Sequence, residues 1–230
     1  MMVMTMTMTM TMTMTMTMLD PHVHSSYSVD GLTPPRDLAK IAEKRKVFIA
    51  ITDHDCIKGS LVGRRFSNRI ILGSEVSTAD GHLLALGIDK DVKKGMKAEE
   101  TVEIIKDQGG VAIAAHPFRL RNGIGKKINS KFDGIEILNA RCTKKENEKA
   151  MRFGEKRKLN IAKTGGSDCH VIDFLFATYT EVEGETGEEI LEAIRRGRTK
   201  PMGTEMERKE VMKQKIYNFF IIVERRKLQI

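Results

Sequence analysis

Short apolar runs, each followed at once by a polar motif, constrain the fold of this chain more than any other feature. Runs of four to eight apolar residues are typical of buried strands, and the segments between them carry the spacing of helices. Strands that alternate with helices form a mainly parallel sheet. Five of the runs lead directly into a histidine or a carboxylate: His22, His54, Glu75, His116 and Asp168. Because parallel strands end at one rim of a barrel, these five residues are predicted to lie together.

The pattern predicts about seven strands, a number that fits a barrel better than a small open sheet. Strands are expected up to Leu19 and at 47–51, 70–72, 83–86, 111–115, 135–138 and 161–164, and residues 177–182 are a candidate last strand. The first helix is expected to open with Thr33 as N-cap and Pro34 in its first turn. Further helices are expected over 98–108, 144–157 and 188–196.

Composition divides the chain into three parts. Residues 1–18 contain a strict Met-Thr alternation. Such a repeat specifies no strand register, so we expect this tract to be disordered except that its last residues can form the first strand. Residues 19–203 form the barrel domain. Residues 204–230 are basic. They can form either a terminal helix packed on the barrel or a frayed tail, and the sequence does not decide between the two.

The net charge of +8 is concentrated toward the C-terminus. This charge favours anionic substrates or surfaces, and a merely basic surface is the alternative. No Trp and only three Tyr argue against a platform for stacking nucleic-acid bases. No apolar run approaches ~20 residues, so no membrane span is expected. Three cysteines without paired spacing indicate a reducing, cytoplasmic location.

All six histidines lie in short acidic, Gly-rich or Pro-marked motifs. In His22-x-His24 both imidazoles project from one face of an extended segment, and Asp168-x-His170 repeats this geometry. Asp53 and Asp55 flank His54, and either is placed to orient its ring. The candidate metal ligands are His22, His24, Asp30, His54, Glu75, His82, His116, Asp168 and His170. Since three or four ligands complete a catalytic site, this set implies two or three divalent ions.

The motifs resemble, in their order along the chain, those of the PHP (polymerase and histidinol phosphatase) superfamily, in its small stand-alone type. They are Asp-Pro-His-Val-His-Ser at 20–25 with Asp-Gly at 30–31, Thr-Asp-His-Asp at 52–55, Gly-x-Glu at 73–75, Ala-His-Pro at 115–117, and Gly-Ser-Asp-x-His at 166–170. The resemblance implies an α/β chain with a distorted (β/α)7 TIM-like barrel in a single domain. It also implies phosphoester hydrolysis with Mn, Zn or Fe.

The resemblance further implies three ligand sets. The first is His22, His24, Glu75 and Asp168; the second is Glu75, His82 and His116; the third is Asp30, His54 and His170. Glu75, which would bridge two ions, and Asp168 are the expected catalytic residues. Pro21 departs from the leucine usual at its position, and it removes a backbone N–H from the strand.

Arg119 and Arg141 follow the motifs at the same rim, where a guanidinium can clamp a phosphate. We therefore expect a metal-bridging hydroxide to attack a small-molecule phosphoester, either a monoester or a diester, with a nucleotide as one option. The alternatives are a nuclease acting on nucleic-acid ends, an amidohydrolase-like enzyme and a non-catalytic metal-binding module. No membrane partner is expected. The sequence does not decide whether nucleic acid is a partner, and it does not decide the oligomeric state.

Overall fold

The computed structural model describes residues 15–156 and 159–227. Nine strands form one sheet in the order β7-β6-β5-β4-β3-β2-β1-β8-β9. The strands are β1 (Met16–Val23), β2 (Phe48–Ile51), β3 (Ile70–Ser77), β4 (His82–Leu86), β5 (Val111–Ala114), β6 (Gly134–Asn139), β7 (Ala162–Gly166), β8 (Thr178–Glu183) and β9 (Thr199–Gly203). The end of the Met-Thr repeat therefore belongs to β1. Residues 1–14, for which disorder was predicted, lie outside the described residues.

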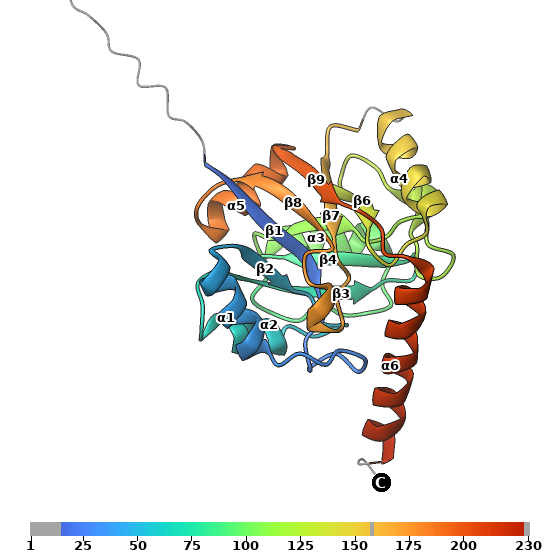
Figure 1. Cartoon of the computed structure of the whole chain (residues 1–230). Helices are drawn as coiled ribbons and strands as arrows, with labels where there is room; N and C mark the ends of the chain where they lie inside the picture. The colour runs from blue at the N-terminus through green and yellow to red at the C-terminus, as the bar shows by residue number, and fades with distance from the viewer. Residues whose placement is uncertain (1–14, 157–158, 228–230) are drawn as a thin grey trace, which may run out of the picture.

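The sheet curls into a nearly closed barrel, as predicted (Figure 1). Closure occurs where the chain leaves β7 and meets the end of β1. Val23 pairs there with Cys169 in parallel, and the His24 N–H donates to the Cys169 carbonyl at 2.8 Å. On β1 the register shifts between Asp20 and Val23, the stretch that contains Pro21. The proline is thus accommodated at an irregularity, where a missing N–H costs least.

The sheet is less parallel than the sequence pattern predicts. β1, β2 and β3 pair in parallel, as do β5, β6 and β7. β4 is antiparallel to both neighbours, and β8 is antiparallel to β1 and β9. The reason lies in the connections: the short 78–81 turn between β3 and β4 leaves no room for a crossover helix, which a parallel pair requires. β3 also extends past Glu75, which lies inside the strand rather than after it.

The helices cover the outside of the barrel, except the last one, which runs away from it (Figure 1). They are α1 (Pro35–Arg45), α2 (Lys58–Arg64), α3 (Ala98–Asp107), α4 (Lys144–Lys156), α5 (Gly187–Arg195) and α6 (Arg208–Lys227), with 3-10 turns η1 (Gly125–Lys127) and η2 (Ile172–Phe174). α1 begins one residue later than predicted: Pro34 is its N-cap, and Thr33 makes no capping bond. α2 was not predicted, since it spans only seven residues. No helix among the described residues is long and apolar enough to cross a membrane.

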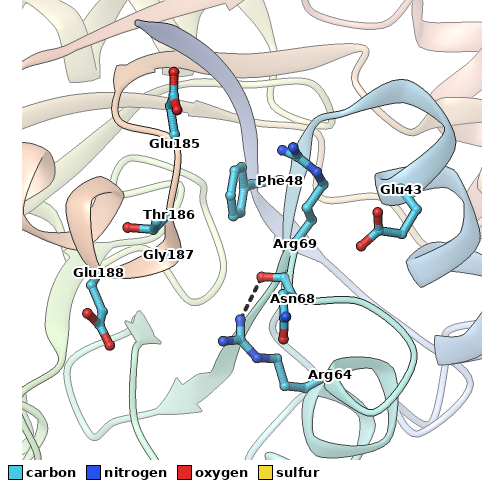
Figure 2. A pocket seen from close by; sticks show the side chains of 9 residues that line it. All are labelled: Glu43, Phe48, Arg64, Asn68, Arg69, Glu185, Thr186, Gly187 and Glu188. Carbon is cyan, nitrogen blue, oxygen red and sulfur yellow. Dashed lines mark hydrogen bonds between the residues drawn. The ribbon is translucent and has the colours of Figure 1, made fainter. Parts of the chain in front are cut away.

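A polar cavity of about 390 Å³ opens at the amino-terminal ends of β2 and β3 (Figure 2). Phe48, Arg64 and Arg69 line it together with Glu185 and Glu188 near the start of α5. The Arg64 guanidinium donates to the Asn68 carbonyl at 2.7 Å, and the Arg69 guanidinium lies over the Phe48 ring. Charges of both signs line this cavity and none of the candidate ligands does, so the chemistry lies at the other end of the strands.

Candidate metal centre

All nine candidate ligands meet at the carboxyl-terminal rim of the barrel. They form four groups in which the ligand atoms lie within 4.8 Å of one another. The groups are His22, His24 and Asp168; His22, Glu75 and His116; His54, Glu75 and His82; and His24, Asp30, His54 and His170. These groups differ from the sets that the resemblance implies. His82 joins His54 rather than His116, and His24 also joins the third set. His22 joins Glu75 and His116, and Glu75 is not in the group of His22, His24 and Asp168.

The Nε2 atoms of His22 and His24 both point toward the same position. Behind each ring, Nδ1 is held: His22 Nδ1 lies 3.1 Å from Glu136 Oε1, and His24 Nδ1 lies 3.0 Å from Ser28 Oγ. In front, neither Nε2 atom has a hydrogen-bond partner, although both are buried. A buried nitrogen without a partner costs free energy unless something else binds it. The two buried nitrogens therefore suit the ligands of a single metal ion.

Two carboxylate oxygens complete the ring of atoms around that spot. His22 Nε2 lies 3.4 Å from Glu75 Oε2 and 3.7 Å from Asp168 Oδ1. The corresponding distances from His24 Nε2 are 3.3 and 3.5 Å. Four ligands placed tetrahedrally at about 2.1 Å from one divalent ion lie about 3.4 Å from one another. The separations and the donor types both fit such an ion.

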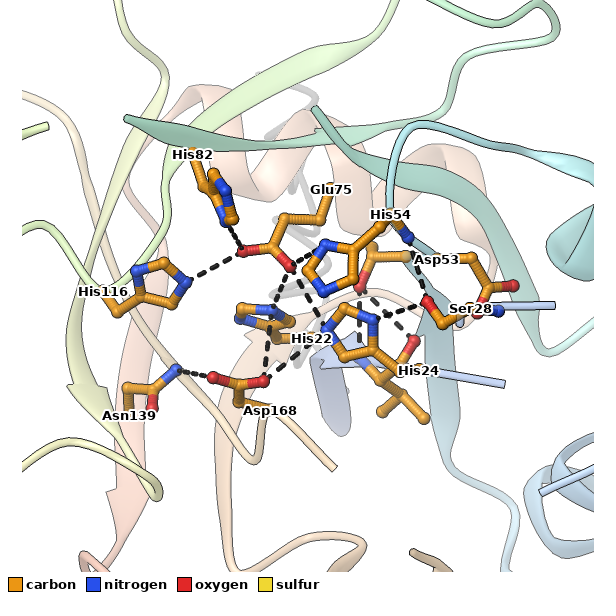
Figure 3. Close-up of polar contacts among 12 residues, drawn as sticks. His22, His24, Ser28, Asp53, His54, Glu75, His82, His116, Asn139 and Asp168 are labelled. Carbon is orange, nitrogen blue, oxygen red and sulfur yellow. Dashed lines mark hydrogen bonds and ion pairs between the residues drawn. The ribbon is translucent and has the colours of Figure 1, made fainter. Parts of the chain in front are cut away.

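Glu75 lies at the centre of the cluster, with imidazoles on both sides of its carboxylate (Figure 3). Oε1 lies 2.7 Å from His82 Nδ1 and 2.8 Å from His116 Nε2. Oε2, which faces His22 and His24, also lies 3.1 Å from His54 Nδ1. One buried carboxylate thus contacts five histidines, an arrangement that suits a group bridging two ions.

The third group lies at the more exposed edge of the cluster. Asp30 Oδ2 is 3.0 Å from His170 Nε2, and Asp30 Oδ1 is 3.8 Å from His54 Nε2. The prediction that Asp53 or Asp55 orients the His54 ring is wrong. Asp53 accepts hydrogen bonds from Ser25 N and Ser25 Oγ, both at 2.7 Å, and Asp55 accepts from Ser77 N at 2.7 Å. The two aspartates instead hold the backbone of neighbouring segments, Asp53 near Ser25 and Asp55 near Ser77.

The charge of the cluster favours a cation. Burial alone would lower the pKa of His24, but Asp168 and Glu75 raise it to about 9. Burial would raise the pKa of the Glu75 and Asp168 carboxyls, yet the surrounding imidazoles and, for Asp168, two guanidinium groups hold both well below their usual range. Buried carboxylates that stay ionised create the negative potential that attracts a divalent ion.

Arg119 and Arg141 both reach Asp168 from the rim. Arg119 Nη2 donates to Asp168 Oδ2 and, at 3.1 Å, to Asn139 Oδ1. Arg141 Nη1 donates to Asp168 Oδ1 at 3.2 Å and lies 2.8 Å from His170 Nδ1. Burial, with the Arg141 charge, lowers the pKa of His170 to about 3, so its ring stays neutral with a lone pair for a metal. The side chains of Arg119 and Arg141 remain 25 and 13% exposed.

Two of the candidate ligands have strained backbones. His116 has φ 27° and Asp168 has φ 51°, a region that non-glycine residues seldom adopt. Such conformations persist only where surrounding contacts hold them, and they concentrate at functional sites. The His116 N–H donates to Glu136 Oε2 at 2.7 Å, so one of the two turns is held by a buried carboxylate.

Glu136 is the main residue of the site that sequence reasoning missed. It is buried in β6, accepts from His116 N and Asn139 Nδ2 with Oε2, and contacts His22 Nδ1 with Oε1. A Cβ at Gly166 would lie 2.5 Å from Glu136 Oε1 and 2.7 Å from His22 Cβ, so a glycine here lets both side chains approach closely. The available signal was a single acid between Ile135 and Ile137, in a strand otherwise apolar around it.

Glu136→Gln is expected to weaken metal binding by about 10- to 100-fold, as for other residues that orient a metal-binding histidine. An amide either donates to the His22 ring or accepts from it more weakly, so the ring loses its orientation. Competition with a fluorescent chelator measures the affinity. Glu181→Gln on β8 is the matched control, since Glu181 lies 3.6 Å from Lys200 and away from the cluster. Equal affinity for both variants would remove Glu136 from the site.

Comparisons with known proteins agree with this geometry. Residues 144–199 match a protein-family profile described as PHP-associated. An uncharacterised protein of Methanocaldococcus jannaschii, MJ1587, is 36% identical over 138 residues, which cover 53% of this chain and 81% of that protein. The chain belongs to the PHP superfamily.

Solved structures share the PHP fold with this chain. A two-domain protein of Bacteroides vulgatus containing a predicted PHP-like metal-dependent phosphoesterase superposes with a TM-score of 0.68 at 21% identity, over 87% of this chain and 69% of that one. The lesion-specific endonuclease PfuEndoQ of Pyrococcus furiosus superposes with a TM-score of 0.55 at 19% identity, over 82% of this chain and 58% of that one. At these identities the likeness establishes the barrel and not the substrate.

Proposed function

We propose that this PHP protein is a metal-dependent phosphoesterase that acts on a small-molecule phosphoester. The observation that carries the proposal is the set of four atoms around one point, His22 Nε2, His24 Nε2, Glu75 Oε2 and Asp168 Oδ1. The two nitrogens in this set are buried and have no hydrogen-bond partner. The set is suited to a divalent ion, and the other five candidate ligands surround it on the same rim.

The ligands fall into distinct roles in this proposal. His22, His24, Glu75 and Asp168 would hold one ion, His82 and His116 would share a second with Glu75, and Asp30, His54 and His170 would hold a third. Divalent ions bound there would polarise the phosphoryl oxygens and lower the pKa of water to near neutrality. Glu136 and Ser28 hold the His22 and His24 rings from behind, so these rings are aligned before substrate arrives.

The two arginines favour a phosphoester over a neutral amide. Arg119 and Arg141 place guanidinium groups at the partly exposed edge of the cluster, where a substrate enters. A phosphoester carries charge that a planar guanidinium binds with two parallel hydrogen bonds, and a neutral amide offers no such partner. In the transition state these donors stabilise the negative oxygens on phosphorus.

Protein purified without chelator is expected to contain two or three transition-metal ions per chain and to hydrolyse a chromogenic phosphoester. Treatment with chelator should abolish this activity, and Mn or Zn should restore it. Elemental analysis and bis(p-nitrophenyl) phosphate or p-nitrophenyl phosphate turnover measure the two quantities on the same preparation. Less than one ion per chain after metal is restored would contradict the proposal.

A substrate panel separates the remaining options. Mononucleotides, histidinol phosphate, short oligonucleotides and a chromogenic amide should be assayed together with Mn. We expect hydrolysis of small phosphoesters and none of the amide. Preference for oligonucleotide ends over every small phosphoester would indicate a nuclease instead, in keeping with the basic charge of the chain.

A further inference from the structure

Asn139, the last residue of β6, is a buried amide whose orientation is fixed by its neighbours. Its Nδ2 donates to Glu136 Oε2 at 2.9 Å and, at 3.4 Å, to Asp168 Oδ2 (Figure 3). Its Oδ1 accepts from Arg119 Nη2 at 3.1 Å and from the Arg141 backbone N–H at 3.0 Å. An ionised carboxylate only accepts and these arginine nitrogens only donate, so the amide fits in one orientation. Asn139 therefore links the acids of the cluster to both arginines.

The first turn of α4 holds Asn139 and the loop that carries Arg119. Asn147 donates from Nδ2 to the Asn139 carbonyl and accepts at Oδ1 from the Asn139 N–H, both at 3.1 Å. Glu146 Oε1 accepts from the Leu120 N–H at 3.2 Å. All three hydrogen bonds run to the backbone, so they fix where β6 ends and where the Arg119 loop passes. One helix thus ties both segments together.

Asn139 and Asp168 affect the arginines in different ways, although both arginines contact both residues. Asp168 accepts from Arg119 at Oδ2 and from Arg141 at Oδ1. A carboxylate that accepts from a guanidinium also neutralises its charge, whereas a neutral amide oxygen orients the group and leaves the charge in place. Asn139 is therefore suited to hold Arg119 in a position where its charge still attracts an anion.

We propose that Asn139 is a positioning residue that orients Arg119 and Arg141 for the phosphoryl group of the substrate. This inference rests on the proposed function, which supplies that group. Arg119 is held through its guanidinium and Arg141 through the backbone N–H at the start of its loop. A long side chain that is oriented beforehand loses less conformational entropy when its ligand binds. Loss of the Asn139 amide should therefore weaken phosphate binding and leave the metal ligands in the chain.

Binding of inorganic phosphate to the Mn-loaded full chain, measured by isothermal titration calorimetry, tests this role. Asn139→Ala should keep the metal content of the wild type and bind phosphate about 10- to 100-fold more weakly, as for other residues that orient a functional group from behind. Asn129→Ala is the matched control, since Asn129 donates to Glu99 at 2.6 Å on an exposed surface. Unchanged phosphate affinity in Asn139→Ala would overturn the proposal.

A double-mutant cycle separates positioning from general damage to the fold. If Asn139 acts through Arg119, the two changes are not independent. The variant with both Arg119→Ala and Asn139→Ala should then lose less phosphate affinity than the product of the two single losses. Losses that multiply would overturn the proposal. Loss of ions in Asn139→Ala would also overturn it, because Asn139 would then support the metal centre rather than the arginines.

A second variant tests the same role if circular dichroism shows that Asn139→Ala is unfolded. Asn147→Ala removes the two contacts that hold the Asn139 backbone and leaves the Asn139 amide in the chain. It should retain its ions and bind phosphate more weakly, and unchanged affinity would overturn the proposal. A wild type without bound ions or phosphoesterase activity would overturn the proposed function as well. An active wild type with full phosphate affinity in the Asn139 and Asn147 variants would exclude only the positioning role.

Discussion

Glu75→Gln is expected to reduce turnover to the background of the assay while the barrel stays folded. The Glu75 carboxylate contacts five histidines and faces two of the ligand groups. An amide has the same shape but no charge, and its nitrogen cannot coordinate an ion. Loss of one electrostatic group in an active site costs about 10²- to 10³-fold in kcat, and this change affects more than one ion. Steady-state kinetics with saturating Mn and elemental analysis measure the effect.

Two further variants make this result specific. Asp168→Asn should behave like Glu75→Gln, because Asp168 completes the same set of four atoms. Glu103→Gln should leave activity unchanged, because Glu103 is an exposed residue of α3 paired with Lys131 at 3.0 Å. Near wild-type turnover in Glu75→Gln, with its ions still bound, would exclude the carboxylate from the mechanism.

Arg119→Ala is expected to retain its metal ions but to lose about 2–4 kcal/mol of transition-state stabilisation, which is about 30- to 1000-fold in kcat/KM. In the structure this guanidinium neutralises Asp168 and is fixed by Asn139. In the proposed function, the same guanidinium would also bind a phosphoryl group of the substrate at the rim. Arg119→Lys should recover only part of the loss, because an ammonium lacks the planar fork.

The comparison requires kcat/KM and metal content from the same preparations. Arg121→Ala is the matched control, since Arg121 is an exposed arginine two residues along the same loop. Loss of ions together with activity in Arg119→Ala would mean that Arg119 acts by holding Asp168 rather than by binding substrate. Full activity of Arg119→Ala would indicate that Arg141, rather than Arg119, binds the phosphate.

Residues at strand ends were predictable because their placement follows from local rules. A buried apolar run predicts a strand, and in a βα barrel its carboxyl end lies at the functional rim. This reasoning identified five of the nine residues that the structure gathers, and the histidine and acid motifs beside them supplied the other four. The helix bounds were also close to those observed, since α3 and α5 each lie within one residue of the expected limits.

The contacts behind the ligands were not predictable, because they join residues far apart in the chain. Glu136 reaches His22 across 114 positions, and Asp53 holds Ser25 across 28. When a single acidic residue lies in an apolar strand, the sequence around it does not identify the residue that it contacts. The pairing of the arginines with Asp168 has the same origin, since it depends on how two loops approach one strand end.

The sequence by itself determined the barrel class and the ligand inventory, because strand periodicity and the choice of His, Asp and Glu are local properties. Only the tertiary structure decided which ligand atoms share an ion, which buried groups orient them, and that β4 and β8 run antiparallel. It also decided that α6 runs away from the barrel and leaves Ile216 and Phe219 exposed. These features depend on distances between segments that are far apart in the sequence. Such distances are set only when the barrel closes and the loops pack against it, so no local residue pattern predicts them.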